Sequence, residues 1–291
     1  MPHVLALDVG GTKVATGLVD VFGALSHKDQ IPTQELAGDT LYDRLLRLVR
    51  NTLHEASSSV EAIGIGCGGP AKNAYELVSP LHIPEWENFP LREKLENDLQ
   101  ISTYVDNDAK ALALAEGWVG TAKNYKNFLA MVVSTGVGGG IVLNGTLLDG
   151  ADGNAGHIGH IFVDPEGGQD ANGVSGLLEG SASGSALHRI LGTPASNASD
   201  EMRNHVGELV GRAVASVANL LDLQLAVISG SVALGFGNIF FEAAQKEIDK
   251  LSRIEHARGT KIVPSELDAD GPLIGAGAVG WRALGKDILK V

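Results

Sequence analysis

Asp8-Val9-Gly10-Gly11-Thr12-Lys13 separates two short apolar runs, residues 4–7 and 14–19. The runs predict two strands joined by a tight turn whose glycines leave the backbone bare, because tight reversals often need φ > 0 and a polyanion must approach closely. Backbone N–H groups in such a turn bind anions, Thr12 and Lys13 can add donors, and Asp8 can hold Mg²⁺. The stretch predicts a phosphate-binding turn; the alternative is a plain β-hairpin whose Asp and Lys are solvated.

Composition limits the fold and the partners. With 291 residues, 44% of them hydrophobic, the chain is expected to form two lobes. The formal net charge of −13 argues against a sequence-independent grip on nucleic acid or on an acidic membrane. It does not argue against a phosphorylated ligand, which needs only local donors.

Cysteine usage and hydropathy point to the compartment. Cys67 is the single cysteine, so an internal disulfide and a thiolate-rich metal site are both excluded. No segment has the pattern of a secretory leader or the length of a membrane span. We therefore expect a cytoplasmic protein without nucleic-acid or membrane partners.

The first third of the chain reads as a meander followed by alternating helices and strands. Residues 4–7, 14–19 and 25–31 predict three antiparallel strands, and residues 41–53 an amphipathic helix capped by Asp39 or Thr40. Buried strands are expected at residues 62–65 and 102–105, and a helix at residues 109–116.

The opening pattern then recurs. Residues 128–133 predict a strand, residues 134–140 a glycine turn, residues 141–143 a return strand, and Asn144-Gly145 a two-residue turn. A third glycine turn, Ser229-Gly230-Ser231, follows a helix at 212–223 and a buried strand at 225–228. Two matching meanders predict two lobes with phosphate-binding turns across a cleft, and the third turn could approach a nucleotide base or ribose.

Four motifs together carry a resemblance over residues 6–284: the DxGGTK opening, Asn107-Asp108-Ala109, the STGVGGGIV run from residue 134, and the AGHIGH segment from residue 155. They resemble the ROK sugar kinases, which belong to the ATPases with the actin, hexokinase and Hsp70 fold. The resemblance implies an α/β protein of two RNase H-like lobes around a central cleft, closing on ATP and a sugar. We expect a smaller lobe of residues 1–110 plus 283–291 and a larger one of residues 111–282.

The resemblance implies that Asp108 is the catalytic base. A carboxylate within hydrogen-bond reach can orient a sugar hydroxyl and accept its proton, and a helix N-terminus favours the ionised form. The alternative is that Asp108 only caps the helix, although both roles can coexist.

The same resemblance implies the binding residues. Asn107 and Glu179 would contact the sugar, Glu179 near the anomeric end; Gly69 lies in a turn lining the sugar pocket; and His82 is the nearest candidate for a family Asn. The implied sugar-binding set is Gly69, Asn107, Asp108, His157, His160 and Glu179. The implied ATP- and phosphate-binding set is Asp8, Gly10, Gly11, Thr12, Lys13, Ser134, Thr135, Gly136, Gly138 and Gly230.

One departure from the family concerns zinc. Members commonly hold a structural zinc with the histidine that corresponds to His160 and three cysteines, but residues 170–177 here read DANGVSGL. A tetrahedral thiolate site is therefore impossible. His160, Asp170 and Asn172 leave open a weak oxygen/nitrogen site. The expected cofactors are ATP and Mg²⁺, without zinc.

The second departure is His157, where glucokinase-type members usually carry Glu in an AGExGH segment. The AGHIGH form resembles bacterial N-acetylmannosamine kinases. A neutral imidazole offers one donor and one acceptor where a carboxylate only accepts, which could suit a 2-acetamido substituent or an axial 2-position. The alternative is that His157 merely accommodates glucose differently.

These observations predict an ATP-dependent kinase acting on the 6-hydroxyl of a hexose or N-acetylhexosamine, with N-acetylmannosamine preferred. One alternative is a glucokinase using ATP or polyphosphate, and another is a non-catalytic sugar-sensing protein. Family repressors carry an additional N-terminal helix-turn-helix; since a strand begins by residue 4, we expect no DNA-reading module. By the same resemblance we expect a homodimer or homotetramer.

Overall fold

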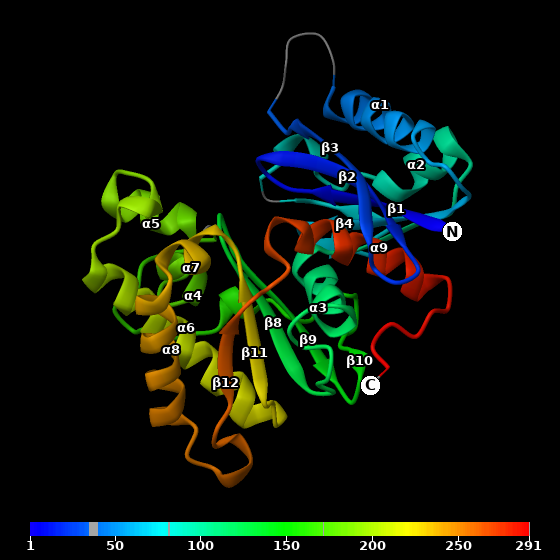
Figure 1. The fold of residues 1–291 in the computed structure, drawn as a ribbon. Coiled ribbons are helices and arrows are strands. Elements are labelled where there is room, and N and C mark those ends of the chain that lie inside the picture. Colours follow the sequence, from blue (N-terminus) through cyan, green and yellow to red (C-terminus); the bar gives the residue numbers. More distant parts are fainter. Residues whose placement is uncertain (35–39, 81, 171, 291) are drawn as a thin grey trace. The chain divides into compact units, whose positions relative to one another are not determined.

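The computed structural model describes residues 1–34, 40–80, 82–170 and 172–290, and these fall into two units (Figure 1). Unit 1 comprises Met1–Lys123, Leu147–Ala155 and Leu267–Lys290. Unit 2 comprises Asn124–Thr146 and Gly156–Glu266. Between its two stretches in unit 2 the chain thus passes through unit 1, to which it adds the nine-residue segment Leu147–Ala155.

The expected lobe boundaries at residues 110 and 283 fall inside two helices, α3 (Asp108–Trp118) and α9 (Gly271–Ala283). Both helices pack as wholes within unit 1. A Cβ on Gly275 of α9 would lie 2.5 Å from the Ala111 oxygen of α3, and one on Gly64 of the sheet would overlap the Ala276 carbonyl. This close backbone contact places residues 111–123 and 267–282 with unit 1.

Unit 1 is built on a five-stranded sheet of order β3-β2-β1-β4-β7. The meander pairs antiparallel, whereas β1, β4 and β7 are parallel. The strands are β1 (His3–Val9), β2 (Lys13–Asp20), β3 (Leu25–Pro32), β4 (Val60–Cys67) and β7 (Thr103–Asn107), with a separate β5 (Ala71–Lys72) and β6 (Leu77–Val78) pair. All five predicted strands of this part are confirmed, each one to four residues longer than expected.

Helices cover both faces of this sheet. On one face, apolar side chains of β1 and β4 form a core with α1 (Leu41–His54) and α2 (Leu91–Leu99). On the other lie α3 and α9 (Figure 1). The side chain of Thr40 caps α1 by accepting a hydrogen bond from the Asp43 amide, which confirms one of the two expected caps. The other, Asp39, lies outside the described residues.

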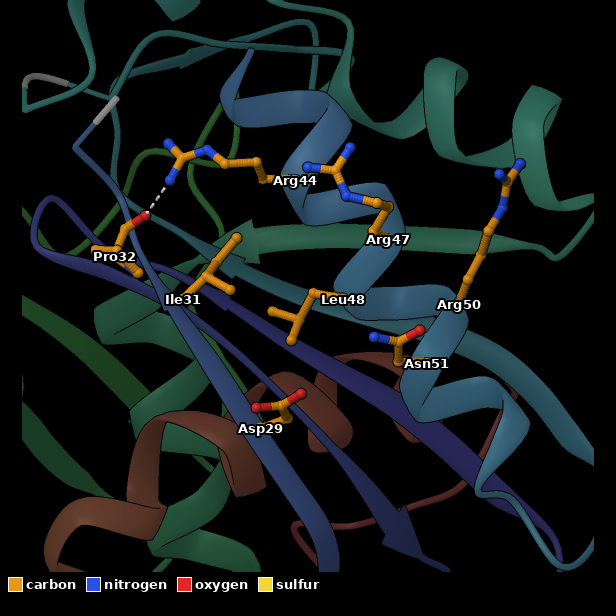
Figure 2. A pocket seen from close by; sticks show the side chains of 8 residues that line it. All are labelled: Asp29, Ile31, Pro32, Arg44, Arg47, Leu48, Arg50 and Asn51. Atoms are coloured by element: carbon orange, nitrogen blue, oxygen red, sulfur yellow. Dashed lines mark hydrogen bonds between the residues drawn. The ribbon is translucent and has the colours of Figure 1, made fainter. Parts of the chain in front are cut away.

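A cavity of about 400 Å³ lies between β3 and α1 (Figure 2). Arg44 lines it, but the Arg44 guanidinium donates to the carbonyl oxygens of Pro32 at 2.9 Å and Thr33 at 3.0 Å. This side chain therefore fastens the end of β3 to α1. The lining includes none of the predicted site residues.

Unit 2 contains the second sheet, of order β10-β9-β8-β11-β12. Its strands are β8 (Phe128–Val133), β9 (Val137–Leu143), β10 (Thr146–Leu147), β11 (Leu225–Ser229) and β12 (Lys261–Pro264). The return strand begins at Val137 and not at residue 141, because Gly138 and Gly139 pair with β8. A Cβ on Gly139 would lie 3.1 Å from Ile158 Cγ2, so the glycines let the AGHIGH segment pack directly on β9.

Unit 2 also contains five helices among its described residues: α4 (Leu178–Ala182), α5 (Gly184–Leu191), α6 (Asp200–Leu221), α7 (Ser231–Phe236) and α8 (Asn238–Leu251). α6 begins twelve residues before the expected start at residue 212, with Ser199 as its cap. Gly207 and Gly211 interrupt the apolar pattern of α6. The backbone of α8 packs closely against α6 at these two glycines, since a Cβ on either would lie 2.5 Å from a carbonyl oxygen of α8.

Single 3-10 turns occur at Pro84–Trp86, Ile158–His160, Ala195–Asn197, Glu255–Ala257 and Asp268–Asp270. Across the described ranges, no helix is both long and apolar enough to cross a membrane.

Candidate functional site

The parallel strands of unit 1 bring predicted site residues to one edge of the sheet. The register aligns Asp8 of β1 with Gly66 of β4 and Asp106 of β7, so the carboxyl ends of the three strands coincide. A Cβ on Gly66 would lie 4.0 Å from Asp8 Oδ1 and 3.6 Å from Asp108 Cα. Gly66 therefore keeps the space between Asp8 and Asp108 clear of side chains.

Asp8 is half-buried at this edge. Burial, followed by the negative charge of Asp108, raises the pKa of Asp8 to about 7, and the nearby Lys13 ammonium opposes the shift. A carboxylate held this way gains from a cation, because the charged form otherwise lacks compensation for its lost hydration.

The turn after β1 is fixed by its own backbone and by β3. The Gly10 amide donates to the Lys13 oxygen at 3.0 Å, while Thr33 donates its hydroxyl to the Gly10 oxygen at 2.7 Å and its amide to the Thr12 oxygen at 3.0 Å. Gly11, Thr12 and Lys13 are exposed. Thr33 was not predicted as part of the site, because nothing in the sequence indicates that it closes this turn.

The expectation that these glycines need a positive φ is wrong, since neither Gly10 nor Gly11 adopts one. The requirement is steric. A Cβ on Gly11 would lie 2.5 Å from His82 Cβ, and one on Gly10 would lie 3.1 Å from the Lys13 oxygen. His82, the expected counterpart of a family Asn, thus lies against the Gly10-Gly11 turn.

At the start of α3, Asn107 and Asp108 occupy different positions relative to the helix. Asn107 is the N-cap: its Oδ1 accepts from the Ala109 amide at 3.0 Å and the Lys110 amide at 3.3 Å. Asp108 is the first helical residue and is exposed, with Oδ1 accepting from the Ala109 amide at 2.8 Å. The alternative in which Asp108 caps the helix is therefore wrong, because Asn107 fills that position.

A cavity of about 350 Å³ in unit 1 has Asp8 and Lys13 in its wall. Lys28 and Asp270 also line it and form an ion pair at 2.7 Å. Lys13 Nζ donates to Gln30 Oε1 at 3.3 Å, so this ammonium lies over β3 beside the turn.

Unit 2 brings the second and third glycine turns together. Ser134 and Ser231 are joined by a hydroxyl–hydroxyl hydrogen bond of 3.0 Å. The Ser134 and Thr135 carbonyls accept from the amides of Gly184 and Ser185 at the start of α5. Gly230 has φ +103°, and a Cβ there would overlap the Val133 carbonyl, so this position requires glycine.

The predicted sugar residues of unit 2 gather beside the same turn. A Cβ on Gly136 would lie 2.9 Å from Glu179 Oε1, and one on Gly159 would lie 3.3 Å from Glu179 Cβ. The rings of His157 and His160 meet edge to face at 5.8 Å, and both residues are exposed. Glu179, in the first turn of α4, thus lies between the glycine turn and the AGHIGH segment.

Asp170 organises the stretch in which the family's cysteines are missing. Its carboxylate accepts from the amides of Val174 at 2.8 Å and Asn172 at 2.9 Å, and His160 Nε2 lies 3.7 Å from Oδ2. These backbone hydrogen bonds are the main reason that the pKa of Asp170 lies below its usual value. Among described residues no group of three or more His, Cys, Asp or Glu is arranged to hold a metal ion.

The predicted residues are divided between the two units. Unit 1 holds Asp8, Gly10, Gly11, Thr12, Lys13, Gly69, Asn107 and Asp108; unit 2 holds Ser134, Thr135, Gly136, Gly138, His157, His160, Glu179 and Gly230.

The chain is similar to several known proteins. The model of the ROK family matches residues 4–281. A glucokinase of Halalkalibacterium halodurans is 32% identical over 308 residues, covering 94% of this chain and 93% of the relative. An N-acetylmannosamine kinase of Yersinia pestis is 34% identical over 267 residues, covering 86% and 90%. A ROK glucokinase of Streptomyces griseus, crystallised with glucose and AMPPNP, superposes with a TM-score of 0.82 at 25% identity, covering 96% of this chain and 99% of that one.

Proposed function

The chain belongs to the ROK family and is a sugar kinase, and we propose that it moves the γ-phosphoryl group of ATP to the 6-hydroxyl of a hexose or N-acetylhexosamine. One observation carries the proposal. Asp108 presents an exposed carboxylate at the sheet edge that also carries the phosphate turn, while Asn107 does the capping.

Asp108 acts as the general base in this proposal. A sugar hydroxyl is a weak nucleophile, and a carboxylate that accepts its proton as the bond to phosphorus forms lowers the barrier. The N-terminus of α3 favours the ionised form of Asp108. The proton of the 6-hydroxyl goes to the Asp108 carboxylate, and ADP leaves with the electron pair of the broken P–O bond.

The two glycine turns would hold the phosphates. Gly10, Gly11 and Thr12 offer exposed backbone and a hydroxyl, and Lys13 adds an ammonium. In unit 2, Ser134, Thr135, Gly136 and Gly138 form the second turn, with Gly230 against the adenosine. The complex of the Streptomyces griseus relative with an ATP analogue supports ATP as the donor.

Asp8 fits a Mg²⁺ ion that accompanies ATP. Its carboxylate offers hard oxygen ligands, and its pKa of about 7 reflects burial that a divalent cation would offset. When bound, Mg²⁺ neutralises charge that develops on the phosphate oxygens. Asp8 would hold the ion directly or through water.

The sugar would be held by Gly69, Asn107, His157, His160 and Glu179. Because Asn107 Oδ1 is engaged in the cap, its amide nitrogen is the group left to donate to a hydroxyl. Glu179 can accept hydrogen bonds from hydroxyls near the anomeric carbon. His157 and His160 meet ring to ring, so each restricts the orientation of the other.

N-acetylmannosamine is the preferred substrate in this proposal, and glucose is the second candidate. His157 stands where glucokinase-type members usually carry Glu, which favours the amido sugar. The 32% identity to a glucokinase over nearly the whole chain favours glucose.

A panel of sugars assayed for ADP release with ATP and Mg²⁺ tests the proposal. We expect release that depends on N-acetylmannosamine or a hexose, with phosphate appearing on the 6-oxygen of the product. Polyphosphate in place of ATP tests the other donor. ATP hydrolysis that no sugar stimulates would contradict the assignment.

A further inference from the structure

Lys110 is a charged side chain buried within two residues of the proposed base. It lies in the first turn of α3 and is 1% exposed. Its ammonium contacts Asp106 Oδ1 at 2.8 Å, Asp149 Oδ1 at 2.8 Å and the Gly153 oxygen at 3.0 Å. An ammonium has three N–H donors, so these three acceptors saturate it.

Arg282, at the end of α9, extends the contact into a four-residue cluster of Asp106, Lys110, Asp149 and Arg282. Its Nη2 lies 3.0 Å from Asp149 Oδ2 and its Nη1 lies 3.8 Å from Asp106 Oδ2. Burial raises the pKa of Asp106 although Lys110 opposes it, whereas for Asp149 the hydrogen bonds from Lys110 and Arg282 outweigh burial and lower the pKa. Two negative and two positive groups thus balance, with Lys110 and Asp106 buried and with Asp149 and Arg282 partly exposed.

The cluster holds Leu147–Ala155, the segment of unit 1 that lies in the sequence between the two stretches of unit 2. Asp149 and Gly153 belong to Leu147–Ala155, which is closed on itself by a hydrogen bond from the Ala155 amide to the Asp149 oxygen at 3.0 Å. Its other end is held by Asn154, which donates to the Ala71 oxygen at 3.1 Å and accepts from the Ala71 amide at 3.4 Å. The segment is therefore fixed to both α3 and β5.

Each attachment point adjoins a residue that the proposed function uses. Lys110 shares a helical turn with Asp108, Ala71 follows the Gly69-Pro70 turn, and Ala155 directly precedes Gly156-His157. Lys110 and Asn154 together thus connect three segments that lie next to proposed sugar contacts.

We propose that Lys110 is a positioning residue for the sugar: through Asp149 and Gly153 it sets the first turn of α3 and the segment leading to His157. The inference rests on the proposed function. The competing role for Lys110 is to compensate buried carboxylates and nothing more. The two roles differ in whether restoring charge balance also restores sugar affinity.

The first variant is Lys110→Met, which keeps the length of the side chain and removes its charge. It leaves two carboxylates, Asp106 and Asp149, with Arg282 as the one remaining cation of the cluster, and Asp106 is buried, so Tm falls. We expect kcat/KM for the sugar to fall on the order of 10- to 100-fold, mainly through KM, while KM for ATP changes less than about twofold.

The second variant is Lys110→Met/Asp106→Asn. It removes the uncompensated charge, leaves the Asp149–Arg282 pair in place and still lacks the attachment to Gly153. We expect Tm to recover most of its loss while KM for the sugar stays raised. A double variant with wild-type KM for the sugar would show that Lys110 only balances charge.

Glu247→Gln in unit 2 is the matched control. Glu247 is also a largely buried carboxylate between two cations, Arg212 at 3.2 Å and Lys250 at 3.0 Å, and neither of these partners is a proposed sugar residue. This variant should lower Tm without changing KM for the sugar. If Lys110→Met does not fold, the double variant and Asp149→Asn, whose side chain is 48% exposed, decide the question. Wild-type protein without sugar-dependent ADP release would contradict the proposed function, whereas an active wild type with unchanged KM in these variants would overturn only this inference.

Discussion

Asp8 lies near the end of β1 and Asp108 directly follows the end of β7, with Gly66 of β4 between them, and the charge of Asp108 adds to burial in raising the pKa of Asp8. The relationship follows from register, since the three strands end together. It gives this sheet edge two acidic groups in different surroundings, since Asp8 is half-buried and Asp108 is exposed.

Asp8→Asn should stabilise the protein at neutral and higher pH. The folded-state pKa of about 7 exceeds the ordinary 3.8, so the folded protein binds the proton more tightly, and stability falls as pH rises from about 4 to 7. Asn removes this cost, on the order of 1–3 kcal/mol at pH 8. Melting curves without divalent cations, from pH 4 to pH 8, measure the difference.

In that series the Tm advantage of Asp8→Asn should shrink towards pH 4, and activity should be low at every pH because the cation ligand is lost. Asp108→Asn serves as the control, since removing its charge lowers the pKa of Asp8 and gives a smaller gain. A variant less stable than wild type at pH 8 would contradict the assigned pKa.

Asn107→Ala should lower stability through the lost helix cap. The Lys110 amide loses its side-chain acceptor, and the Ala109 amide is left with Asp108 Oδ1 alone, which costs about 1 kcal/mol. Asn107→Asp keeps an acceptor and should remain close to wild type in Tm. Equal Tm values for the Ala and Asp variants, measured side by side, would show that the cap contributes nothing.

Asp170→Ala should destabilise unit 2, while zinc chelation should not. The substitution removes the acceptor of the Asn172 and Val174 amides, at a cost of about 1–3 kcal/mol. A zinc chelator in the presence of excess Mg²⁺ should leave Tm and activity unchanged. Stoichiometric zinc in protein purified without a metal-affinity tag would refute the prediction.

His157→Glu should shift the sugar preference towards glucose. A site that hydrogen-bonds one substituent discriminates against an analogue that leaves its polar groups unpaired, so the change could reach roughly 1–3 kcal/mol in relative kcat/KM. Kinetics of both proteins on N-acetylmannosamine and glucose measure it. A wild type that already prefers glucose would rule out the amido-sugar assignment and leave the kinase assignment intact.

The strands and glycine turns could be predicted because their signals are local. Short apolar runs beside Gly10-Gly11 and beside Ser134 indicate two similar meanders, and the structure contains both. The start of α6 could not be predicted in the same way, because Gly207 and Gly211 weaken helical propensity and are explained only by the approach of α8.

The sequence indicates candidate site residues one by one, but it does not indicate most of the hydrogen bonds and ion pairs that hold them in place. Asp106 and Lys110, four residues apart, could have been paired from the sequence once a helix start was expected between them. Asp149 could not, because it reaches Lys110 across 39 positions. Thr33 likewise closes the Gly10 turn only because β3 runs back along β2.

The most direct test of the account is the turnover of Asp108→Asn at saturating ATP and sugar, compared with its sugar affinity. Asn107 remains to cap α3, so the variant should fold normally and keep a sugar Kd close to wild type. We predict that kcat falls on the order of 10²–10⁴, the effect of losing a general base. A kcat near that of the wild-type protein would contradict the assignment of Asp108 as the base.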